Sequence, residues 1–332
     1  MAYRFTPDLT KKYTLPEVGS WSRTFHRFDM PSRWAVEAAL AAKRPLLLRG
    51  EPGIGKSQLA RAAAHVLKVP FLSQVIDERS ERDDLLYQYD AVSRLACAQM
   101  AGALKDTTET DWEKAVAESR YISPGVLWWA FDWESAEEQA RDHFRKVPRP
   151  RLPRGGWSQL EPGRAGAVVL IDEIDKADPS VPNGLLECLG NDGFQTAQLE
   201  EAVRLPKDCA PPLIILTTNE ERELPTAFLR RCFVYEMEFP PPGRTVEDFL
   251  LERARVFHTQ SEIVDKVCLS VVEQLLADRA EAVGLSKPGA AEFLDIIRVL
   301  VELHPGDEPA QMKVLKEVHA FALQKNRRQS GQ

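Results

Sequence analysis

The sequence predicts an α/β fold in which a parallel sheet is followed by a smaller helical region. In the first 240 residues, short apolar runs of strand length alternate with stretches of helical pattern, which is the order that βαβ units require. The first apolar run, Pro45–Gly50, leads through a glycine-rich loop into a helical pattern at 57–67. Beyond Gly243 only helical patterning remains, to about residue 325.

The expected elements follow from residue type and length. Residues 33–43 are predicted to form a helix, because alanine and leucine dominate and no breaker intervenes. Residues 82–142 are mostly helical in pattern, whereas residues 1–30 look irregular. Further buried strands are expected at 71–76, 167–171, 213–217 and 232–237. Together these elements predict a three-layer αβα domain.

Composition divides the chain into three parts. Residues 1–32 are expected to form an N-terminal arm rich in aromatic side chains, and residues 33–240 the α/β domain. The run Pro240–Gly243 has the composition of a linker. Residues 244–332 are therefore expected to form a separate helical lid domain.

Charge and cysteine usage narrow the class of protein. The net charge of −7 argues against a protein whose main task is to coat nucleic acid. No apolar stretch is long enough to span a bilayer, and residues 1–8 lack the apolar core of a signal peptide. The cysteines are odd in number and form no C-x-x-C pair, so neither a disulfide framework nor a zinc site is expected. These features predict a cytoplasmic protein.

A phosphate-binding loop is the clearest chemical signal. The pattern G-x-x-x-x-G-K-[ST] is fitted by Gly50, Glu51, Pro52, Gly53, Ile54, Gly55, Lys56 and Ser57, with Gln58 next in the chain. Glycines let the backbone curl so that its N–H groups point at phosphate oxygens. In this pattern Lys56 reaches the terminal phosphates, the Ser57 hydroxyl ligates Mg²⁺, and the following helix adds its positive end. The alternative, a glycine turn with an exposed lysine, is disfavoured by the strand before and the helix after.

Two later strands deliver polar side chains to the same predicted edge of the sheet. The apolar run Val168–Ile171 is followed by Asp172 and Glu173. Asp172 is a candidate Mg²⁺ ligand, and Glu173 is a candidate general base that polarises the attacking water. The run Leu213–Thr218 ends at Asn219, which either positions that water or satisfies a turn.

The choice of nucleotide rests on one short segment. Residues Asp175–Asp178 superficially resemble a guanine-reading motif, but they lack its leading Asn or Thr. They also lie directly beside Asp172 instead of on a later strand. ATP with Mg²⁺ is therefore the expected ligand.

These motifs together resemble the AAA+ fold, and more narrowly the MoxR-like AAA+ ATPases. The resemblance is carried by Gly50–Ser57, Arg82–Asp90, Pro124–Trp128, Val169–Asp175 and Thr217–Cys232. It runs from about residue 40 to 240 and more loosely through the lid. It implies an enzyme that hydrolyses ATP to ADP and phosphate.

The resemblance also implies roles for single residues. Asn219 becomes the sensor 1 residue, and Arg231, with Arg230 beside it, matches the arginine finger that reaches the γ-phosphate in a neighbouring subunit. A finger supplied by a neighbour needs a ring, usually a hexamer, and it stabilises charge during phosphoryl transfer. A local salt bridge is the alternative for the arginine pair. Lys287, just before a helix predicted to begin at Pro288, is the basic residue nearest the usual sensor 2 position.

MoxR-like proteins carry a helical insertion after the second strand and a β-hairpin before sensor 1. Residues 82–142 are expected to hold the insertion and residues 194–206 the hairpin. In such rings these elements face the pore and act on a client, often beside a partner with a von Willebrand A-type domain. The resemblance thus implies a chaperone-like machine. An ATP-switched scaffold in signalling or defence and a nucleic-acid motor are the alternatives, and the acidic net charge disfavours the motor.

Three other clusters each have a structural and a functional interpretation. Aromatic and basic residues interleave at 21–28, where they either stack a base or pin the arm onto the core. The aromatic cluster at 128–133 is expected to be core, with partner docking as the alternative. The basic stretch 141–164 is expected to be a solvated loop, with an acidic partner or single-stranded nucleic acid as the alternative.

Overall fold

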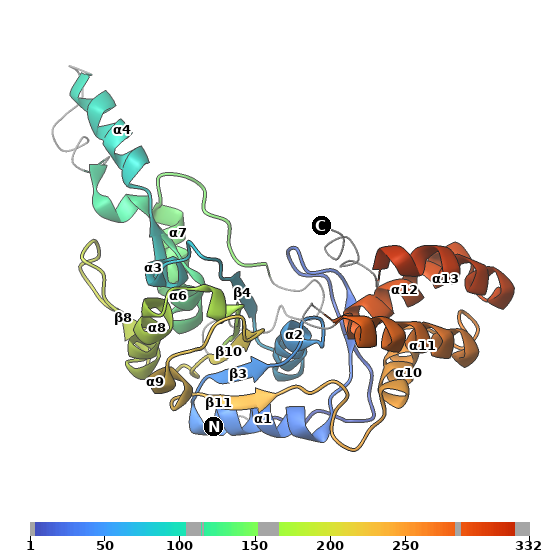
Figure 1. Ribbon diagram of the computed structural model, residues 1–332. Coiled ribbons are helices and arrows are strands. Elements are labelled where there is room, and N and C mark those ends of the chain that lie inside the picture. The colour runs from blue at the N-terminus through green and yellow to red at the C-terminus, as the bar shows by residue number, and fades with distance from the viewer. Residues whose placement is uncertain (1–3, 104–113, 115, 152–165, 283–286, 323–332) are drawn as a thin grey trace.

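A computed structural model describes most of the chain (Figure 1). The described residues are 4–103, 114, 116–151, 166–282 and 287–322. Part of the basic stretch predicted at 141–164 therefore lies outside them. Within the described residues, no helix has both the length and the apolar character that a membrane span requires.

A five-stranded parallel sheet forms the centre of the larger domain. Its strands, in spatial order, are β11 (Phe233–Glu236), β3 (Leu46–Arg49), β10 (Leu213–Thr218), β7 (Val168–Asp172) and β4 (Phe71–Val75). All neighbouring pairs run parallel, so the carboxyl ends of the strands meet at one edge. The α/β fold class predicted from the sequence is confirmed.

Two hydrophobic cores, one on each face of the sheet, complete the three layers. Successive residues of a strand point to opposite faces, so Leu46 and Leu48 belong to one core and Leu47 to the other. Helices α1 (Met30–Ala42) and α2 (Lys56–Leu67) cover the face of Leu46 and Leu48. The opposite face packs against α3 (Arg82–Leu86), α6 (Val126–Phe131), α8 (Ser180–Gly190) and α9 (Thr226–Leu229).

Helix α1 begins three residues earlier than the predicted start at residue 33. The Asp29 carboxylate accepts a hydrogen bond from the backbone N–H of Ser32 at 2.8 Å, and the Ser32 side chain closes the reciprocal contact. This capping box and a proline in the first turn together stabilise the earlier start.

The sequence suggested an irregular N-terminal segment, but the structure contains two short strands there. Strand β1 (Tyr13–Leu15) pairs antiparallel with β2 (Thr24–His26). The buried Arg61 of α2 donates hydrogen bonds to the carbonyl oxygens of Pro16 and Ser22 at 2.9 and 3.1 Å. These bonds hold the loop between the two strands against the helix that follows the glycine-rich loop.

The predicted insertion contains short strands as well as helices. After α3 come β5 (Tyr87–Tyr89), α4 (Ala91–Ala103), a 3₁₀ turn η1 (Glu118–Tyr121), β6 (Ile122–Pro124), α6 and α7 (Trp133–Asp142). Strands β5 and β6 pair antiparallel, and α4 projects away from the body of the molecule (Figure 1). The aromatic side chains of the 128–133 cluster are all buried, so they belong to the core and do not form an exposed docking patch.

A small hairpin and a helical domain complete the chain. A 3₁₀ turn η2 (Ile174–Lys176) follows β7, and strands β8 (Gly193–Phe194) and β9 (Val203–Arg204) pair antiparallel where a hairpin was predicted. The lid consists of α10 (Val246–Phe257), α11 (Asp265–Glu281), α12 (Ala290–Leu303) and α13 (Glu308–Ala322), which share a separate hydrophobic core. Helix α12 begins two residues after the predicted start at Pro288.

Candidate functional site

The glycine-rich loop connects β3 to α2 at the carboxyl edge of the sheet. Gly50 and Gly53 have positive φ angles of 140° and 76°. A Cβ atom on Gly50 would lie 2.4 Å from the Met237 carbonyl oxygen, and one on Gly53 would lie 2.5 Å from the Ala291 side chain. Only glycine fits both the backbone angles and the space, so the loop keeps a curled backbone.

Lys56 is held inside this loop by three oxygen acceptors. Its Nζ donates to the carbonyl oxygens of Gly50 and Glu51 at 2.6 and 3.1 Å and to Oδ1 of Asn219 at 2.7 Å. Burial lowers the pKa of Lys56, and the negative charges of nearby carboxylates, Asp172 foremost, oppose that shift. The strand-end asparagine thus contacts the loop lysine directly, which brings two of the predicted residues together.

The predicted metal ligands also meet. The Ser57 hydroxyl lies 3.0 and 3.2 Å from the two carboxylate oxygens of Asp172, and Thr217 donates a hydrogen bond to the same carboxylate. A hydroxyl and a carboxylate at one point suit Mg²⁺, which prefers oxygen ligands and takes the rest from phosphate and water. Among the described residues no group of three or more His, Cys, Asp or Glu side chains could hold a metal. The Ser57 and Asp172 oxygens leave the remaining coordination positions of such an ion to phosphate and water.

Glu173 is turned away from Asp172 by the backbone. Its φ of 62° lies in the left-handed region, which is uncommon for a residue other than glycine. Its N–H donates to the Thr217 hydroxyl at 2.9 Å, which fixes the turn. Its carboxylate accepts hydrogen bonds from Lys176 at 2.7 Å and from the Asn219 amide at 3.4 Å. Glu173 and Asn219 therefore face one another, as a base and a water-positioning group would.

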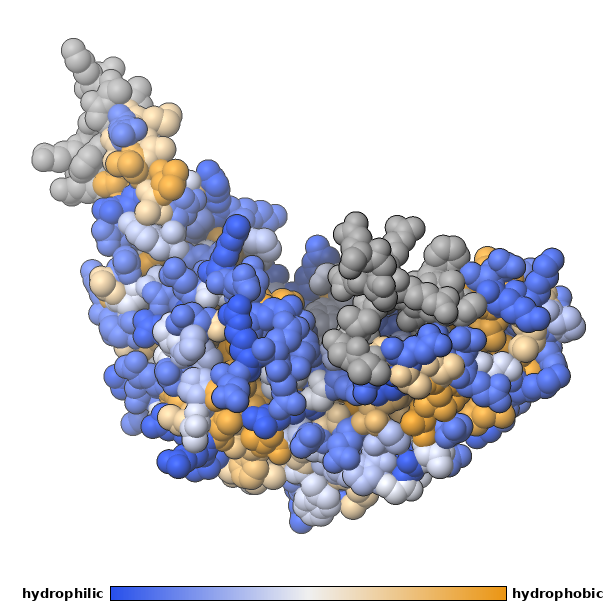
Figure 2. Space-filling model, viewed as in Figure 1, coloured by the Kyte–Doolittle hydropathy of each residue, from blue (hydrophilic) through white to orange (hydrophobic). Residues whose placement is uncertain are grey.

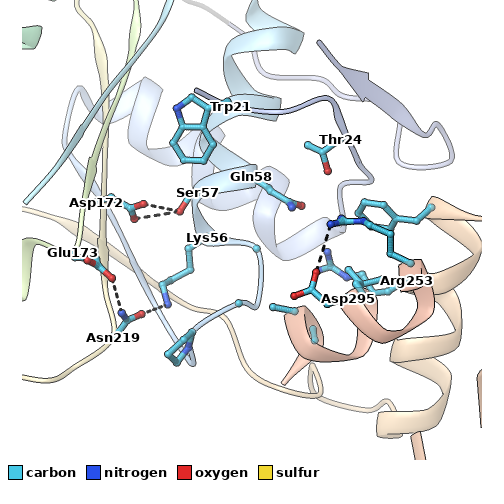
Figure 3. A pocket seen from close by; sticks show the side chains of 18 residues that line it. Trp21, Thr24, Lys56, Ser57, Gln58, Asp172, Glu173, Asn219, Arg253 and Asp295 are labelled. Atoms are coloured by element: carbon cyan, nitrogen blue, oxygen red, sulfur yellow. Dashed lines mark hydrogen bonds and ion pairs between the residues drawn. The ribbon is translucent and has the colours of Figure 1, made fainter. Parts of the chain in front are cut away.

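These residues line a cavity of about 350 Å³ between the two domains (Figure 3). From the sequence-predicted set it is lined by Pro52, Gly53, Gly55, Lys56, Ser57, Gln58, Asp172, Glu173 and Asn219. Gly50 and Glu51 lie in the same loop and hold Lys56 through their carbonyl oxygens, and Ile54 is buried in it. One cavity thus gathers the loop, the acidic strand end and the asparagine.

Outside the glycine-rich loop, three predicted residues do not line this cavity. Arg230 and Arg231 are exposed at the end of α9, so neither reaches the site of its own chain. Lys287 is also exposed and does not line the cavity. The structure therefore does not bring Lys287 to the cavity wall.

The sequence reasoning missed the side chains that close the cavity from the lid and from the N-terminal segment. They are Trp21, Thr24, Arg253, Phe257, Ala290, Ala291, Leu294, Asp295 and Arg298. The α12 members recur at the spacing of one helix face, so helical periodicity could have identified them. Trp21 and Thr24 belong to the aromatic and basic stretch whose role was open. Trp21 both contacts the core through Phe71 and lines the cavity.

The lid is attached directly to the glycine-rich loop. The Arg279 guanidinium makes two hydrogen bonds to the Glu51 carboxylate, at 2.9 and 3.0 Å, and a third to the Pro288 carbonyl oxygen at 2.6 Å. The same guanidinium lies 4.7 Å from the centre of the Phe239 ring. Arg279 therefore links the loop, the segment between the domains and the approach to α12.

The fold and the site define a P-loop nucleotide-binding protein with a helical lid. The chain belongs to the AAA domain family, dynein-related subfamily, which matches residues 45–232. That match spans the glycine-rich loop, the Asp172–Glu173 strand end, Asn219 and the arginine pair.

The solved structures that match the chain are distant in sequence. A provisionally named ATPase from Cytophaga hutchinsonii is 13% identical, with a TM-score of 0.34, over 89% of this chain and 80% of its own. Two variants of RuvB from Thermotoga maritima are 15% and 13% identical, with TM-scores of 0.40 and 0.38. These matches cover 86% and 87% of this chain and 67% of each RuvB chain. No protein with a curated description matches the chain.

Proposed function

We propose that this chain is a MoxR-like AAA+ ATPase that binds ATP with Mg²⁺, hydrolyses ATP and works as a ring to remodel a partner protein. The observation that carries the proposal is the convergence of Lys56, Asp172, Glu173 and Asn219 on one cavity. Residue types needed for phosphate binding, metal binding and water activation meet there, on elements distant in sequence. Family membership supports the same chemistry.

The proposed roles follow from the contacts. Lys56 neutralises phosphate charge, and its present acceptors are the kind of oxygen that a phosphate replaces. Ser57 and Asp172 hold Mg²⁺, which supplies charge neutralisation at the phosphates when it is bound. Glu173 accepts the proton of the attacking water, and Asn219, 3.4 Å away, orients that water.

A ring is proposed because the arginine pair that matches the finger, Arg230 and Arg231, lies outside the cavity lining. Asn219, Glu173 and Lys56 lie in the cavity, whereas Arg230 and Arg231 are exposed outside its lining. Phosphoryl transfer gains strongly from an arginine at the transferred phosphate. A neighbouring copy, in a hexamer for example, would supply that arginine.

The client is proposed to be a protein. Helix α4 of the insertion projects from the body of the molecule (Figure 1 and Figure 2), and neither α4 nor the β8–β9 hairpin lines the cavity. The proposal includes a partner protein with a von Willebrand A-type domain. It also includes a cytoplasmic location for the chain. Nucleic acid is a less suitable client because the net charge is −7.

The test is Glu173→Gln, which keeps the shape of the side chain and removes its basicity. Hydrolysis is expected to fall by about 10²- to 10⁴-fold, the range typical of a positioned general base. Nucleotide affinity should remain, because Lys56 and the loop are unchanged. Glu223→Gln, an exposed glutamate in the segment after β10, is the matched control. Unchanged turnover in Glu173→Gln would remove the catalytic assignment.

A second candidate function is an ATP-switched scaffold. The exposed position of Lys287 favours it, because a lid without that contact would couple weakly to the phosphates. This candidate predicts very slow turnover together with strong ATP-dependent assembly. Fast turnover stimulated by a partner would exclude it.

A further inference from the structure

Arg253 on the first lid helix, α10, lies against the glycine-rich loop. It lines the nucleotide cavity from the lid side (Figure 3). Its Nη2 lies 3.5 Å from the Ile54 carbonyl oxygen, at the limit of a hydrogen bond. Its Nη1 lies 3.6 Å from the position that a Cβ atom on Gly55 would occupy, so the guanidinium fills the space that the glycine leaves. The positive charge of Arg253 therefore lies against the glycine-rich loop beside Gly55.

Within the part of the chain that the structure describes, the guanidinium of Arg253 forms no ion pair with a carboxylate. Among the ion pairs formed by the described residues, none includes Arg253. Two cations nearby, Arg27 and Arg244, both pair with Glu252. The adjacent His26 is buried, and neither of its ring nitrogens has a hydrogen-bond partner in the described chain. The neighbourhood is thus rich in positive charge, and the contacts of the Arg253 guanidinium are the Ile54 carbonyl oxygen and the Phe249 ring, whose centre lies 5.0 Å away, rather than an anion.

Desolvation of the Arg253 guanidinium makes the lack of a carboxylate partner unfavourable in free energy. Burial lowers the pKa of Arg253, and of its charged neighbours Asp29 opposes the shift while Arg244 and Arg27 add to it. A buried cation costs free energy unless an anion or several hydrogen bonds compensate it. The other arginine of the lining, Arg298, lies 3.6 Å from Asp295 and is largely exposed, so it does not have the same need.

We propose that Arg253 binds an anionic oxygen of the nucleotide's phosphate chain and supplies the lid's charged contact that Lys287 does not. The inference rests on the proposed function, since it requires that the cavity hold a nucleotide. In this proposal the first lid helix, α10, contacts the nucleotide's phosphates, and the segment before α12 does not. A bidentate arginine suits this task because its planar fork matches phosphate oxygens.

The matched control is two residues away on the same helix. Arg255 is exposed, pairs with Asp265 and lies outside the cavity lining. The experiment measures ADP affinity by titration calorimetry, and unfolding temperature with and without ADP, for the unaltered chain, Arg253→Gln, Arg253→Lys and Arg255→Gln.

Arg253→Gln is expected to weaken ADP binding by about 10- to 100-fold, the range for a lost hydrogen bond to a charged group. Arg255→Gln should leave the ADP affinity unchanged, and Arg253→Lys should retain part of the lost affinity because the positive charge remains. Without ADP, Arg253→Gln should be at least as stable as the unaltered chain, since an uncompensated charge is removed. With ADP it should gain less stability.

The outcomes separate the inference from the proposed function. No ADP binding by the unaltered chain would overturn both. Equal ADP affinity in the unaltered chain and Arg253→Gln would overturn the inference alone. Arg253→Lys as weak as Arg253→Gln, or a lower stability of Arg253→Gln without ADP, would show that Arg253 acts through packing and would also overturn it.

Discussion

The guanidinium of Arg279 on lid helix α11 donates two hydrogen bonds, of 2.9 and 3.0 Å, to the carboxylate of Glu51 in the glycine-rich loop. The pair is 228 residues apart in the chain and joins the two domains at the nucleotide cavity. Because Arg279 also donates to the Pro288 carbonyl oxygen, one side chain fixes both the loop and the approach to α12. The lid is therefore held against the loop by the protein itself.

This link predicts a measurable coupling between the domains. Arg279→Gln is expected to lower the free energy of unfolding by about 1–2 kcal/mol, because a charge-assisted pair is broken whose arginine is largely buried and whose carboxylate is partly exposed. In a double-mutant cycle with Glu51→Gln, the two losses should differ from additivity by about 0.5–2 kcal/mol. Urea unfolding measures both quantities.

An exposed ion pair of the lid is the control for this cycle. Lys266 and Glu308 lie 2.6 Å apart at the surface, and Lys266→Gln should cost well under about 1 kcal/mol. Full additivity of Arg279→Gln and Glu51→Gln would contradict a direct link between lid and loop.

The stability of the fold is expected to depend on pH through His26. Burial, with a smaller contribution from the positive charge of Arg253, lowers the pKa of His26 to about 3. The native state therefore keeps the ring neutral, while the unfolded chain binds a proton below about pH 6.5. The stability contributed by the neutral His26 ring is fully present above that pH. The free energy of unfolding then falls by roughly 1.4 kcal/mol per pH unit as the pH decreases from 6.5 toward 3.

Replacing the ring isolates this effect. His26→Phe removes the titrating group in a site already packed against Phe28, so its unfolding free energy should decline less between pH 7 and about pH 4.5. His65 and His258, whose pKa values burial also lowers, leave a residual slope. An identical slope in His26→Phe and the unaltered chain would exclude His26 as the cause.

The metal ligands predict how magnesium affects nucleotide binding. Ser57 and Asp172 are the oxygen donors that meet at the cavity. We expect Mg²⁺ to tighten ATP binding about tenfold in the unaltered chain and hardly at all in Asp172→Asn. Titrations with Mg²⁺ and with EDTA measure the difference.

Asp178→Asn provides the control for the metal experiment. Asp178 is an exposed carboxylate that accepts a hydrogen bond from the Ser180 N–H at 2.9 Å, outside the cavity lining. This variant should keep the magnesium effect. A magnesium effect that persists undiminished in Asp172→Asn would mean that the ion is held elsewhere.

The sequence predicted those parts of the site that local pattern determines. The glycine-rich loop, the Asp172 strand end and Asn219 each follow an apolar strand, and parallel strands place their carboxyl ends at one edge. The short strands β1 and β2 were missed because each has only three residues and depends on contacts with the distant Arg61.

The contribution of the lid to the site could not be predicted from local pattern. Which face of α12 and which residue of α10 meet the loop depends on how the two domains dock. The Arg279–Glu51 link and the contact of Gly53 with Ala291 set that docking, and both join residues far apart in the chain. Proximity along the chain points to Lys287, whereas Arg253 lies close to the glycine-rich loop in space.

The exposed Arg231 predicts that activity requires a neighbouring copy. The double variant Arg230→Ala/Arg231→Ala should bind ATP normally and lose about 10³-fold in turnover, because the charge that it supplies acts in another subunit's site. Arg222→Ala is the control, since Arg222 is exposed nearby and pairs with Glu78 at 2.8 Å. The mass of each protein with no nucleotide, with ADP and with a non-hydrolysable ATP analogue reports whether a ring forms.

Mixing two inactive variants tests the arrangement directly. Glu173→Gln subunits keep the arginines and lack the base, whereas Arg230→Ala/Arg231→Ala subunits keep the base and lack the arginines. In a mixed ring, some interfaces pair an intact base with an intact arginine, so part of the activity should return. If the arginines act within their own chain, every subunit in the mixture lacks one essential group and activity stays absent. A nucleotide-bound monomer in every condition would instead mean that the arginines complete no neighbour's site without a further partner.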